Sequence, residues 1–531
     1  MTQVCVIGGG IAGLAAAALL AKDGHHVTVL EQRPAVGGRA GSWERDGFRF
    51  DTGPSWYLMP EVFDHFYRLL GTTAEEQLEL VSLAPAYRVL FEGVAEPIDI
   101  AASREENLRL FERIEPGSRH RMEGYLRSAG EVYEIAKRRF LYSSFADIRP
   151  LLRWDVLSRA VKLASLLLTP LATLVARTVN DPRLRQILGY PAVFLGASPY
   201  TAPSMYHLMS HLDLEGGVLY PMGGFGTLIG SIESLAVAGG VTILTESTVT
   251  AITTTANRRA DSTGSELPPV TGVEYLDASG GRHSILADIV VSAADLHHTE
   301  TALLPTALQT YPQHYWDKKV PGPSALLIYL GVAGEIPELE HHTLFFAREW
   351  KAGFEKIFGR NPSIPDPASI YVCKPSGVDR STAPDGHSNL FVLVPIPADP
   401  SIGAGEVDGD GDPRIEALAD RVIEQISKWA KIPDLAARIR LRRTVGPQDF
   451  VSELNAWRGT ALGPAHILGQ SAMFRSGNKS SKVAGLFYVG GSTVPGIGLP
   501  MCLISAEVLL KRIRGDRSTE PLAEPLQRQQ P

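Results

Sequence analysis

The sequence VCVIGGGIAG, residues 4–13, decides the fold of this chain. Its four leading apolar residues predict a short strand, and the alanine- and leucine-rich run that follows predicts a helix to about Lys22. The turn between them has the spacing Gly-x-Gly-x-x-Gly, formed by Gly8, Gly10 and Gly13. In a nucleotide-binding unit, the first glycine permits the tight turn, the second lets the backbone approach a pyrophosphate, and the third lets the helix pack on the strand.

An acidic residue after the second strand supports nucleotide binding. Residues 27–30 form another apolar stretch, which ends at Glu31, eighteen residues after Gly13. A carboxylate in this position can accept a hydrogen bond from the hydroxyl of an adenosine ribose. The alternative, a glycine turn that holds no nucleotide, is less favoured, because strand, turn, helix, strand and acid follow one another in the required order.

A second glycine loop follows Glu31 and separates flavin from nicotinamide binding. Residues 33–40 (RPAVGGRA) lead into a hairpin whose turn is Asp46-Gly47, a pair typical of type I′ turns. The segment resembles the Glu-x-x-x-x-x-Gly-Gly-Arg pattern of the superfamily of flavin-containing amine oxidases and phytoene desaturases. This resemblance implies that the loop contacts FAD. A nicotinamide enzyme would be expected to continue with alternating strands and helices instead.

A third glycine-rich turn lies near the far end of the chain. Residues 485–491 (GLFYVGG) predict an apolar strand that runs into glycines, and residues 492–500 lead to a helix from about Met501 to Arg512. The N-terminus of such a helix can offer backbone N–H groups to an anion or to the electron-rich edge of a ring. An ordinary pair of strand and helix is the alternative.

Several separated motifs resemble the bacterial and fungal type of phytoene desaturase, and the resemblance covers nearly the whole chain. Ser476-Gly477 and Val494 depart from the family pattern, which leaves the carotenoid substrate and the number of steps open. The motifs that carry the resemblance are residues 220–227 (YPMGGFGT), 341–343 (HHT), 383–387 (APDGH), 454–456 (LNA) with 459–460, and 470–471 with 474–475.

The resemblance implies an α/β fold in which a Rossmann-like, three-layer FAD-binding domain is interleaved with a mixed-sheet substrate domain and a helical cap. The predicted parts are the FAD-binding domain at 1–75, 216–300 and 471–514, with an exposed loop at 253–269; the substrate domain at 76–102 and 301–470; a membrane-facing cap at 103–215; and a disordered tail at 515–531.

FAD is the cofactor that the resemblance implies, and its contacts are expected from the glycine-rich turns and the segment after the hairpin. The phosphates are expected at the first turn, where the helix begins. The predicted cofactor-binding residues are Gly8, Gly10, Gly13, Glu31, Gly37, Gly38, Arg39, Gly53, Pro54, Ser55, Val249, Gly490, Gly491, Ser492 and Gly498.

The implied reaction is the dehydrogenation of phytoene, an apolar polyene: a hydride passes to the flavin, a neighbouring proton is lost, and a double bond forms. Residues 181–185 (DPRLR) resemble a family segment near the substrate cavity, so Asp181 and Arg185 are candidate catalytic residues, as is His342. Asp181 before a proline is also the pattern of a helix N-cap. The reaction needs no side-chain base if water or a quinone receives the proton, and a quinone or oxygen is the expected electron acceptor.

Two other functions stay open at this point. A carotenoid isomerase or another carotenoid oxidase could share these motifs. The Rab escort proteins share the fold and bind isoprenoid tails without catalysis, but the intact loop Gly37-Gly38-Arg39 argues against a non-catalytic escort. Bound flavin in the purified protein would separate an enzyme from an escort.

Overall composition excludes several classes of protein. The 531 residues carry 51 basic and 58 acidic side chains, a formal charge of −7, which argues against nucleic acid as a partner. Three distant cysteines form neither a disulfide framework nor a CxxC motif, as expected in a reducing cytoplasm. No metal site is predicted, because the histidine pairs lack further ligands at metal spacing and Pro413 takes the place of the glycine that a calcium loop needs.

Residues 137–177 differ from the rest of the chain in charge. They hold eight basic and two acidic residues, with aromatic residues among them and the apolar stretch 163–176 at their end. Fourteen helical residues rise about 21 Å, short of the ~30 Å hydrocarbon core of a bilayer, and Pro170 interrupts them. We therefore predict a cytoplasmic protein that docks peripherally on the anionic inner face of the cell membrane. A core helix with a solvated basic flank is the alternative.

Overall fold

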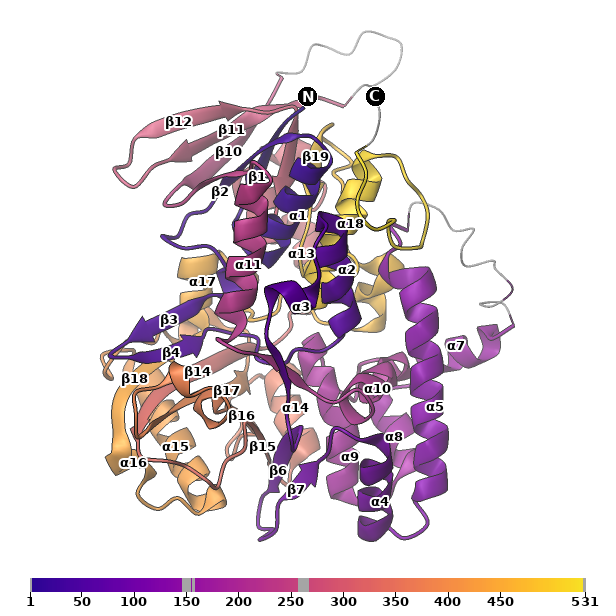
Figure 1. The fold of residues 1–531 in the computed structure, drawn as a ribbon, viewed down its shortest axis with the longest axis vertical. Helices are drawn as coiled ribbons and strands as arrows, with labels where there is room; N and C mark the ends of the chain where they lie inside the picture. Colours follow the sequence, from indigo (N-terminus) through magenta and orange to yellow (C-terminus); the bar gives the residue numbers. More distant parts are fainter. Residues whose placement is uncertain (1, 146–153, 155–157, 256–266, 529–531) are drawn as a thin grey trace.

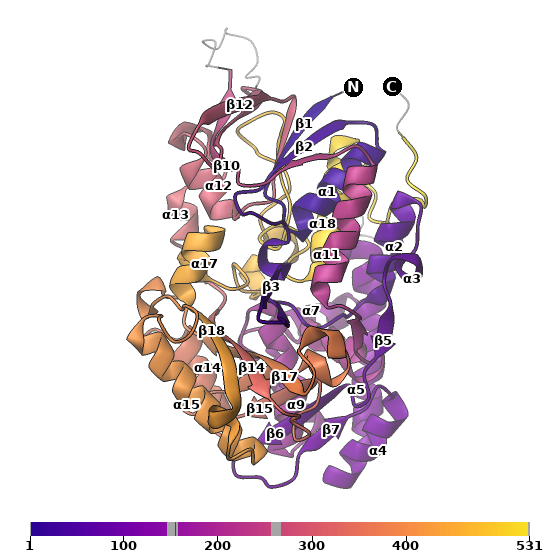
Figure 2. The ribbon, with the colours of Figure 1, turned by 60° about the vertical axis from the view of Figure 1, so that its left-hand side comes forward.

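The computed structural model describes residues 2–145, 154, 158–255 and 267–528. A parallel sheet lies at one end of the molecule, beside both termini, while a mixed sheet and a group of helices occupy the other end (Figure 1). Segments from the beginning, the middle and the end of the chain meet around the parallel sheet (Figure 2). The predicted α/β fold class is confirmed.

The parallel sheet forms because its strands are short apolar runs that can be buried on both faces. Its strand order is β19-β13-β1-β2-β9, and every pair of neighbours is parallel. The strands are β1 (Gln3–Ile7), β2 (His26–Leu30), β9 (Thr242–Leu244), β13 (Ile289–Ser292) and β19 (Leu486–Tyr488).

Alternation of side chains along β1 produces three layers. Val4 and Val6 pack into one core with helices α1, α11 and α18, whereas Cys5 and Ile7 pack into a second core on the other face. An antiparallel sheet, β10-β11-β12, contributes to that second core. The bounds are α1 (Ile11–Lys22), α11 (Phe225–Ala238), α18 (Leu499–Ile513), β10 (Thr248–Thr254), β11 (Val270–Leu276) and β12 (Arg282–Leu286).

The loop predicted at 253–269 falls mainly on residues 256–266, which lie outside the described residues.

The mixed sheet joins two distant parts of the chain, because β6 pairs in parallel with β15. Its order is β18-β14-β17-β16-β15-β6-β7. Helix α15 (Pro413–Ala430) covers one face with an aliphatic stripe, and the aromatic residues of β4 (Phe48–Asp51) pack on the other. The strands are β6 (Tyr87–Phe91), β7 (Ile98–Ile100), β14 (Ser324–Ala333), β15 (His342–Phe346), β16 (Ile370–Cys373), β17 (His387–Ile396) and β18 (Ile439–Val445).

Most of residues 104–214 are helical and share a hydrophobic core with β6, β7 and β15. The apolar stretch 163–176 is not one helix, because α7 ends at Leu168 and Pro170 precedes α8. Among the described residues, none of the helices combines the length and the apolar character needed to cross a bilayer. The helices of this region are α4 (Arg104–Ile114), α5 (Arg119–Ala136), α7 (Ala160–Leu168), α8 (Leu171–Thr178), α9 (Pro182–Gly189) and α10 (Met209–Leu214).

The remaining elements connect these layers. They are β3 (Ser42–Arg45), β4 (Phe48–Asp51), β5 (Leu80–Ser82), β8 (Leu219–Pro221), α2 (Pro60–Leu70), α3 (Ala74–Gln77), α12 (Leu296–Ala302), α13 (Gln313–Trp316), α14 (Trp350–Phe358), α15 (Pro413–Ala430), α16 (Leu435–Arg438) and α17 (Pro447–Leu454).

The hairpin β3–β4 confirms the turn predicted from Asp46-Gly47. The two strands pair antiparallel, and both turn residues have positive φ, as a type I′ turn requires. At the end of β4, the Asp51 carboxylate accepts hydrogen bonds from the backbone N–H groups of Phe225 (3.0 Å) and Gly226 (3.1 Å), where α11 begins. The hairpin therefore connects the mixed sheet to a helix that packs on the parallel sheet.

The prediction of a disordered tail is wrong for residues 515–528. This segment packs against α2 and α18, where Leu526 is buried and its N–H donates to the Leu69 carbonyl at 2.9 Å. The buried Lys511 ammonium donates to two carbonyls of the same segment, at 2.7 and 2.8 Å. The polar composition of the tail conceals these few anchoring contacts.

Acidic neighbours reduce the charge of segment 137–177. Lys137 and Lys162 form ion pairs with Glu134 (2.9 Å) and Glu131 (2.7 Å) of α5. The sequence count of eight basic residues did not include these partners. Arg149, Arg153, Asp147 and Asp155, which that count also used, lie outside the described residues.

Candidate active site

A cavity of about 980 Å³ runs from the glycine turns of the parallel sheet to helix α7. Small-molecule sites commonly measure about 300–1,000 Å³, so this volume lies at the upper end of that range. Residues of the parallel-sheet region, the mixed sheet and the helical region all line the cavity. Most of its wall is apolar.

The first glycine turn adopts the geometry that its sequence predicts. Gly8 has φ of +96°, and its N–H donates to the Leu30 carbonyl at 2.8 Å. A Cβ atom on Gly13 would lie 2.0 Å from the Gly8 carbonyl oxygen, so only glycine lets α1 approach β1 this closely. Gly13 itself does not line the cavity.

The Glu31 carboxylate is fixed at the end of β2. It is buried, and its two oxygens accept hydrogen bonds from the N–H groups of Gly9 (2.7 Å) and Arg33 (2.9 Å). Each oxygen keeps a further lone pair for a ligand hydroxyl. Because Glu31 also lines the cavity, its placement agrees with the predicted contact to a ribose.

The second glycine loop lies directly against the first. The Gly37 N–H donates to the Gly9 carbonyl at 2.9 Å, and a Cβ atom on Gly38 would lie 3.3 Å from the Gly10 Cα. Likewise, a Cβ atom on Gly53 would lie 2.3 Å from a backbone oxygen of the second loop. Glycine is therefore needed here for close packing of loop on loop.

The third turn, after β19, is held by a buried arginine that sequence reasoning did not assign to the site. Arg475 donates to the carbonyl of Thr493 (3.1 Å) and to that of Gly491. Burial lowers the pKa of Arg475 to about 10, so the side chain is a cation at neutral pH. Its guanidinium points toward backbone oxygens and so fixes the course of the turn.

The structure gathers the predicted cofactor residues on one surface. All of them except Gly13 line the cavity, and they come from segments that are hundreds of residues apart in the chain. The lining residues of this set are Gly8, Gly10, Glu31, Gly37, Gly38, Arg39, Gly53, Pro54, Ser55, Val249, Gly490, Gly491, Ser492 and Gly498.

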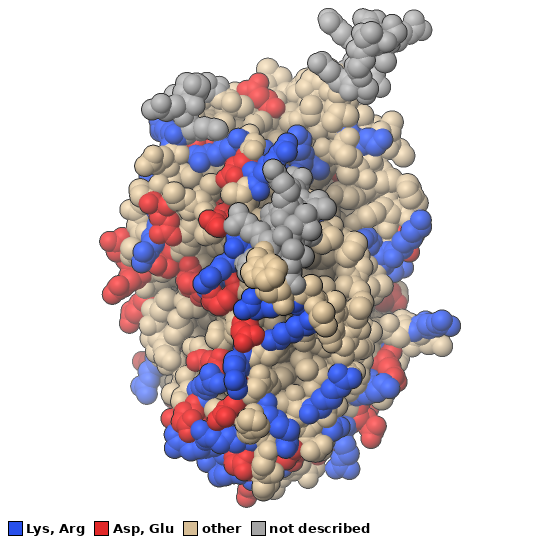
Figure 3. All heavy atoms as spheres, turned by 90° about the vertical axis from the view of Figure 1, so that its right-hand side faces the viewer, with Lys and Arg blue, Asp and Glu red and all other residues tan. Residues whose placement is uncertain are grey.

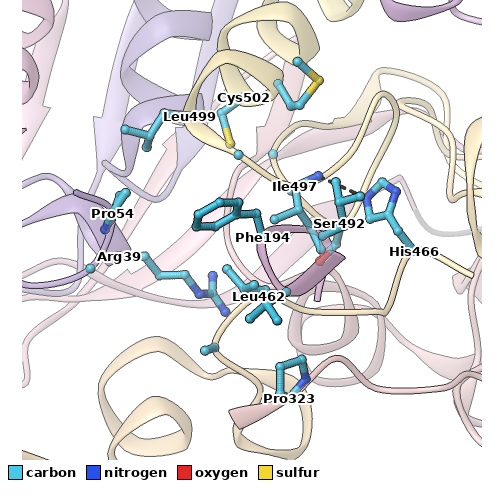
Figure 4. A pocket seen from close by; sticks show the side chains of 18 of the residues that line it. Arg39, Pro54, Phe194, Pro323, Leu462, His466, Ser492, Ile497, Leu499 and Cys502 are labelled. Atoms are coloured by element: carbon cyan, nitrogen blue, oxygen red, sulfur yellow. Dashed lines mark hydrogen bonds between the residues drawn. The ribbon is translucent and has the colours of Figure 1, made fainter. Parts of the chain in front are cut away.

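His466 is a further lining residue that no sequence motif indicated. Its Nε2 atom accepts a hydrogen bond from the Ile497 N–H at 3.3 Å, so its Nδ1–H faces the Tyr206 hydroxyl at 2.8 Å. Burial lowers the pKa of His466 well below its ordinary value, and the ring is neutral. Figure 4 shows Phe194 between this histidine and Arg39, in the middle of the cavity.

Beyond Phe194, the cavity is lined mainly by hydrocarbon side chains. Helix α7 contributes Leu163 and Leu167, and α10 contributes Met209 and Leu212. Such a wall offers few hydrogen-bonding groups, so it favours a long apolar ligand through burial of surface rather than through polar recognition.

The predicted catalytic residues do not meet at one point. Asp181 caps α9 by accepting from the N–H of Arg183 at 2.8 Å, and Arg185 donates to the Val179 carbonyl at 2.9 Å. Neither lines the cavity, so the helix cap that the sequence left open is what the structure shows for Asp181. His342 lies behind the wall, and burial lowers its pKa well below the ordinary value.

Comparison with known proteins identifies the family. Residues 11–507 match the family model for flavin-containing amine oxidoreductases. A carotenoid 3,4-desaturase of Haloarcula japonica is 40% identical over 95% of this chain and 96% of its own length. A zeta-carotene-forming phytoene desaturase of Myxococcus xanthus is 32% identical over 96% of this chain and 93% of its own length.

Solved structures agree at the level of the fold. Putrescine oxidase aligns with a TM-score of 0.59 at 15% identity, over 97% of this chain and 99% of that one. Cyclohexylamine oxidase from Brevibacterium oxydans aligns with a TM-score of 0.54, also at 15% identity. The family match and these neighbours support a flavin cofactor. The chain is an oxidoreductase that belongs to the flavin-containing amine oxidoreductases and, among them, to the carotenoid desaturases.

Proposed function

We propose that this chain is an FAD-dependent carotenoid desaturase that introduces double bonds into a C40 acyclic polyene, with phytoene as its substrate. The observation that carries the proposal is the single continuous cavity, which has nested glycine loops at one end and a hydrocarbon wall at the other. Such a cavity suits a cofactor at one end and an apolar substrate at the other, which supports the proposal.

The residues present fit FAD. Glu31 lines the same cavity as Gly8 and Gly10 and keeps free lone pairs for an adenosine ribose, and the nested glycines leave backbone exposed to the cavity for a pyrophosphate. When bound, FAD supplies a two-electron acceptor for hydride. The protein binds the cofactor, orients the polyene against it and excludes water through the apolar wall.

Deprotonation is assigned to none of the predicted catalytic residues. Asp181 is occupied as a helix cap and Arg185 by backbone carbonyls, while His342 is separated from the cavity by Tyr371, a lining residue. Release of the proton to water or a quinone, the route that needs no side-chain base, agrees with this placement. A quinone or oxygen is the proposed electron acceptor.

Introduction of a 3,4-double bond near the end of a more desaturated carotenoid is a second candidate, favoured by the 40% identity to the Haloarcula japonica enzyme. The enclosing apolar wall suits both substrates, since both are long polyenes. The difference between them concerns which carbon pair reaches the flavin end of the cavity.

Expression of the chain in cells that accumulate phytoene tests the proposal. We expect coloured carotenes with longer absorbance maxima, and a purified protein with the yellow absorbance of bound flavin. A shift of the lycopene absorbance to longer wavelength in lycopene-accumulating cells, without coloured products in phytoene-accumulating cells, would favour the 3,4-desaturase. Altered isomers without longer conjugation would indicate an isomerase, and a flavin-free protein that retains isoprenoids would indicate an escort.

We also propose that the cavity opens toward a membrane surface at α7 and the segment Ala472–Phe474. Exposed apolar side chains gather at this rim: Val161 is 87% exposed and Leu168 74%, and Phe474 is 56% exposed. Neighbouring residues of the same two segments line the cavity. Figure 3 shows Lys and Arg side chains over this side of the molecule, with Asp and Glu among them, and the basic side chains suit anionic lipid headgroups.

A further inference from the structure

A cluster of two histidines and a cysteine lies in the mixed sheet, outside the cavity wall. His342 opens β15 and stands directly opposite Cys373 of β16 in the antiparallel ladder. His341 precedes it, and the two imidazole rings lie 4.6 Å apart at 88°. One nitrogen from each ring and the Cys373 sulfur all lie within 4.8 Å of one another. Sequence spacing indicated no third ligand for this histidine pair, because Cys373 is distant in the chain.

The cluster contains buried polar atoms without partners. His341, His342 and Cys373 are 5%, 0% and 2% exposed. Both ring nitrogens of His341 and Nε2 of His342 make no hydrogen bond among the described residues. A buried polar atom without a partner is destabilising, and native structures hold few of them. Three such atoms side by side indicate that a bound ion or molecule satisfies them.

The orientation of His342 is that of a metal ligand. Its Nδ1 atom is hydrogen bonded to the Tyr371 hydroxyl at 2.8 Å, and that hydroxyl is 2.6 Å from the Ser55 hydroxyl. Trp56 stacks on the ring, with centroids 4.4 Å apart and planes at 8°. Ligating histidines typically have one nitrogen fixed by an outer hydrogen bond, which leaves the other nitrogen free for the metal.

We propose that His341, His342 and Cys373 bind one soft, thiophilic cation, and that Cu(I) fits the site better than Zn(II). Imidazole nitrogen and thiolate sulfur are the ligands that such cations select. On binding, the Cys373 thiol releases its proton to solvent and the thiolate bonds to the cation. Cu(I) with one thiolate is neutral, whereas Zn(II) with one thiolate leaves a positive charge in a buried site, which is costly.

The distances require a small contraction. Metal–nitrogen bonds of about 2.0–2.1 Å and metal–sulfur bonds of about 2.3 Å place ligand atoms roughly 3.5–4 Å apart. Binding therefore requires the largest separation between ligand atoms, up to 4.8 Å, to shorten by about 1 Å. A buried water bridging the two histidines is the competing occupant, and it would not need the sulfur.

The site is independent of flavin binding, so it can be tested with the flavin-loaded protein. The purified chain is incubated with one equivalent of Cu(I) or of Zn(II) in the presence of a coloured chelator that competes for the metal, and is then desalted. Metal content is measured by inductively coupled plasma mass spectrometry, and flavin content by absorbance. The variants are Cys373→Ser and His341→Ala. Cys5→Ser is the matched control, because Cys5 is equally buried but lies in the parallel sheet.

We expect one cation per chain for the wild type and the Cys5→Ser control, with Cu(I) held at least tenfold more tightly than Zn(II). Cys373→Ser and His341→Ala should weaken binding at least 100-fold while flavin content stays the same. X-ray absorption of the copper form should show one sulfur and two nitrogen neighbours. Less than a tenth of an equivalent of either metal in the wild type, or full binding by Cys373→Ser, overturns the proposal. Neither result bears on flavin content or desaturation, which are measured separately.

Discussion

Glu31 holds the first glycine turn and, in the function that we propose, also binds the ligand. Its carboxylate accepts from the backbone of Gly9 and Arg33 and still has a lone pair on each oxygen. The spacing Gly-x-Gly-x-x-Gly with an acid after the next strand was sufficient to predict this residue, because the geometry of strand, turn and helix is local. The glycines of the second loop were predicted from a resemblance, and their loop-on-loop packing gives the physical reason for them.

Replacing Glu31 with Ala should weaken FAD binding about ten- to hundredfold. A hydrogen bond to a charged group contributes about 1.5–3 kcal/mol, and the variant also leaves two backbone N–H groups without an acceptor. Fluorescence titration of the flavin-free protein with FAD measures the effect. Glu44→Gln is the control, since Glu44 is an exposed carboxylate on strand β3. Equal FAD affinity in Glu31→Ala and the wild type would show that Glu31 does not bind FAD.

Arg475 and His466 could not be predicted in the same way. Each acts on backbone that is brought to it only by the fold: Arg475 on Gly491 and Thr493, and His466 on Ile497. Nothing in the local sequence distinguishes a buried arginine from an exposed one. The prediction of catalytic roles for Asp181 and Arg185 had the same weakness. It rested on the similarity of residues 181–185 to a family segment, and the sequence does not show which residues line the cavity.

The start of helix α11 depends on an aspartate from another element. Asp51 of β4 accepts from the first N–H groups of the helix, and burial raises its pKa to about 6. Its folded-state pKa is above the ordinary value of 3.8, so the folded protein holds this proton more tightly than the unfolded chain. This group therefore adds stability as the pH falls through about 6.

Asp51→Asn should remove that pH dependence. We expect the melting temperature of the wild type to rise, relative to the variant, between pH 7.5 and pH 5.5. Differential scanning fluorimetry of both proteins at several pH values gives the comparison. Parallel curves for the two proteins over this range would show that folding does not raise the pKa of Asp51.

The C-terminal segment behaves as an element although it has no regular secondary structure. Removing residues 516–531 exposes the surface that Leu526 covers and deprives the buried Lys511 ammonium of two acceptors. We expect a loss of about 2–4 kcal/mol in unfolding free energy, from burial of one leucine and from a buried ammonium left short of partners. Urea denaturation checks it, with removal of 529–531 alone as control. Identical midpoints would show that the segment contributes nothing.

Sequence patterning predicted the regular elements better than this segment. The strands around β1 and the hairpin β3–β4 have strong local signals, in apolar runs and in the Asp46-Gly47 turn. The tail has one buried leucine among polar residues, so its order depends on a surface formed by α2 and α18, which no local pattern encodes.

At the scale of the whole molecule, the exposed apolar rim should determine membrane binding. The double change Val161→Asp with Leu168→Asp should reduce binding to vesicles that contain phosphatidylglycerol by at least tenfold, because full burial of such side chains contributes about 1.5–3 kcal/mol each. Co-sedimentation with vesicles measures it. Leu286→Asp is the matched control, since Leu286 is 80% exposed on β12, at the far end of the molecule (Figure 1).

Net charge was the least informative whole-molecule quantity in the sequence. The value of −7 averages over a basic segment, and ion pairs with α5 then reduce the charge of that segment in the folded state.

If the double variant at Val161 and Leu168 binds vesicles as well as the wild type does, the rim is not the surface that contacts the membrane.

The continuity of the cavity has a kinetic consequence. The flavin end and the apolar wall form one space, so the two proposed substrates, a polyene and a membrane-dissolved quinone, would have to occupy it one after the other. We expect double-displacement kinetics: double-reciprocal plots for the carotene at several fixed quinone concentrations should be parallel. Each substrate at high concentration should also inhibit competitively against the other. Intersecting lines would require that both molecules occupy the protein together, and hence a second passage to the flavin.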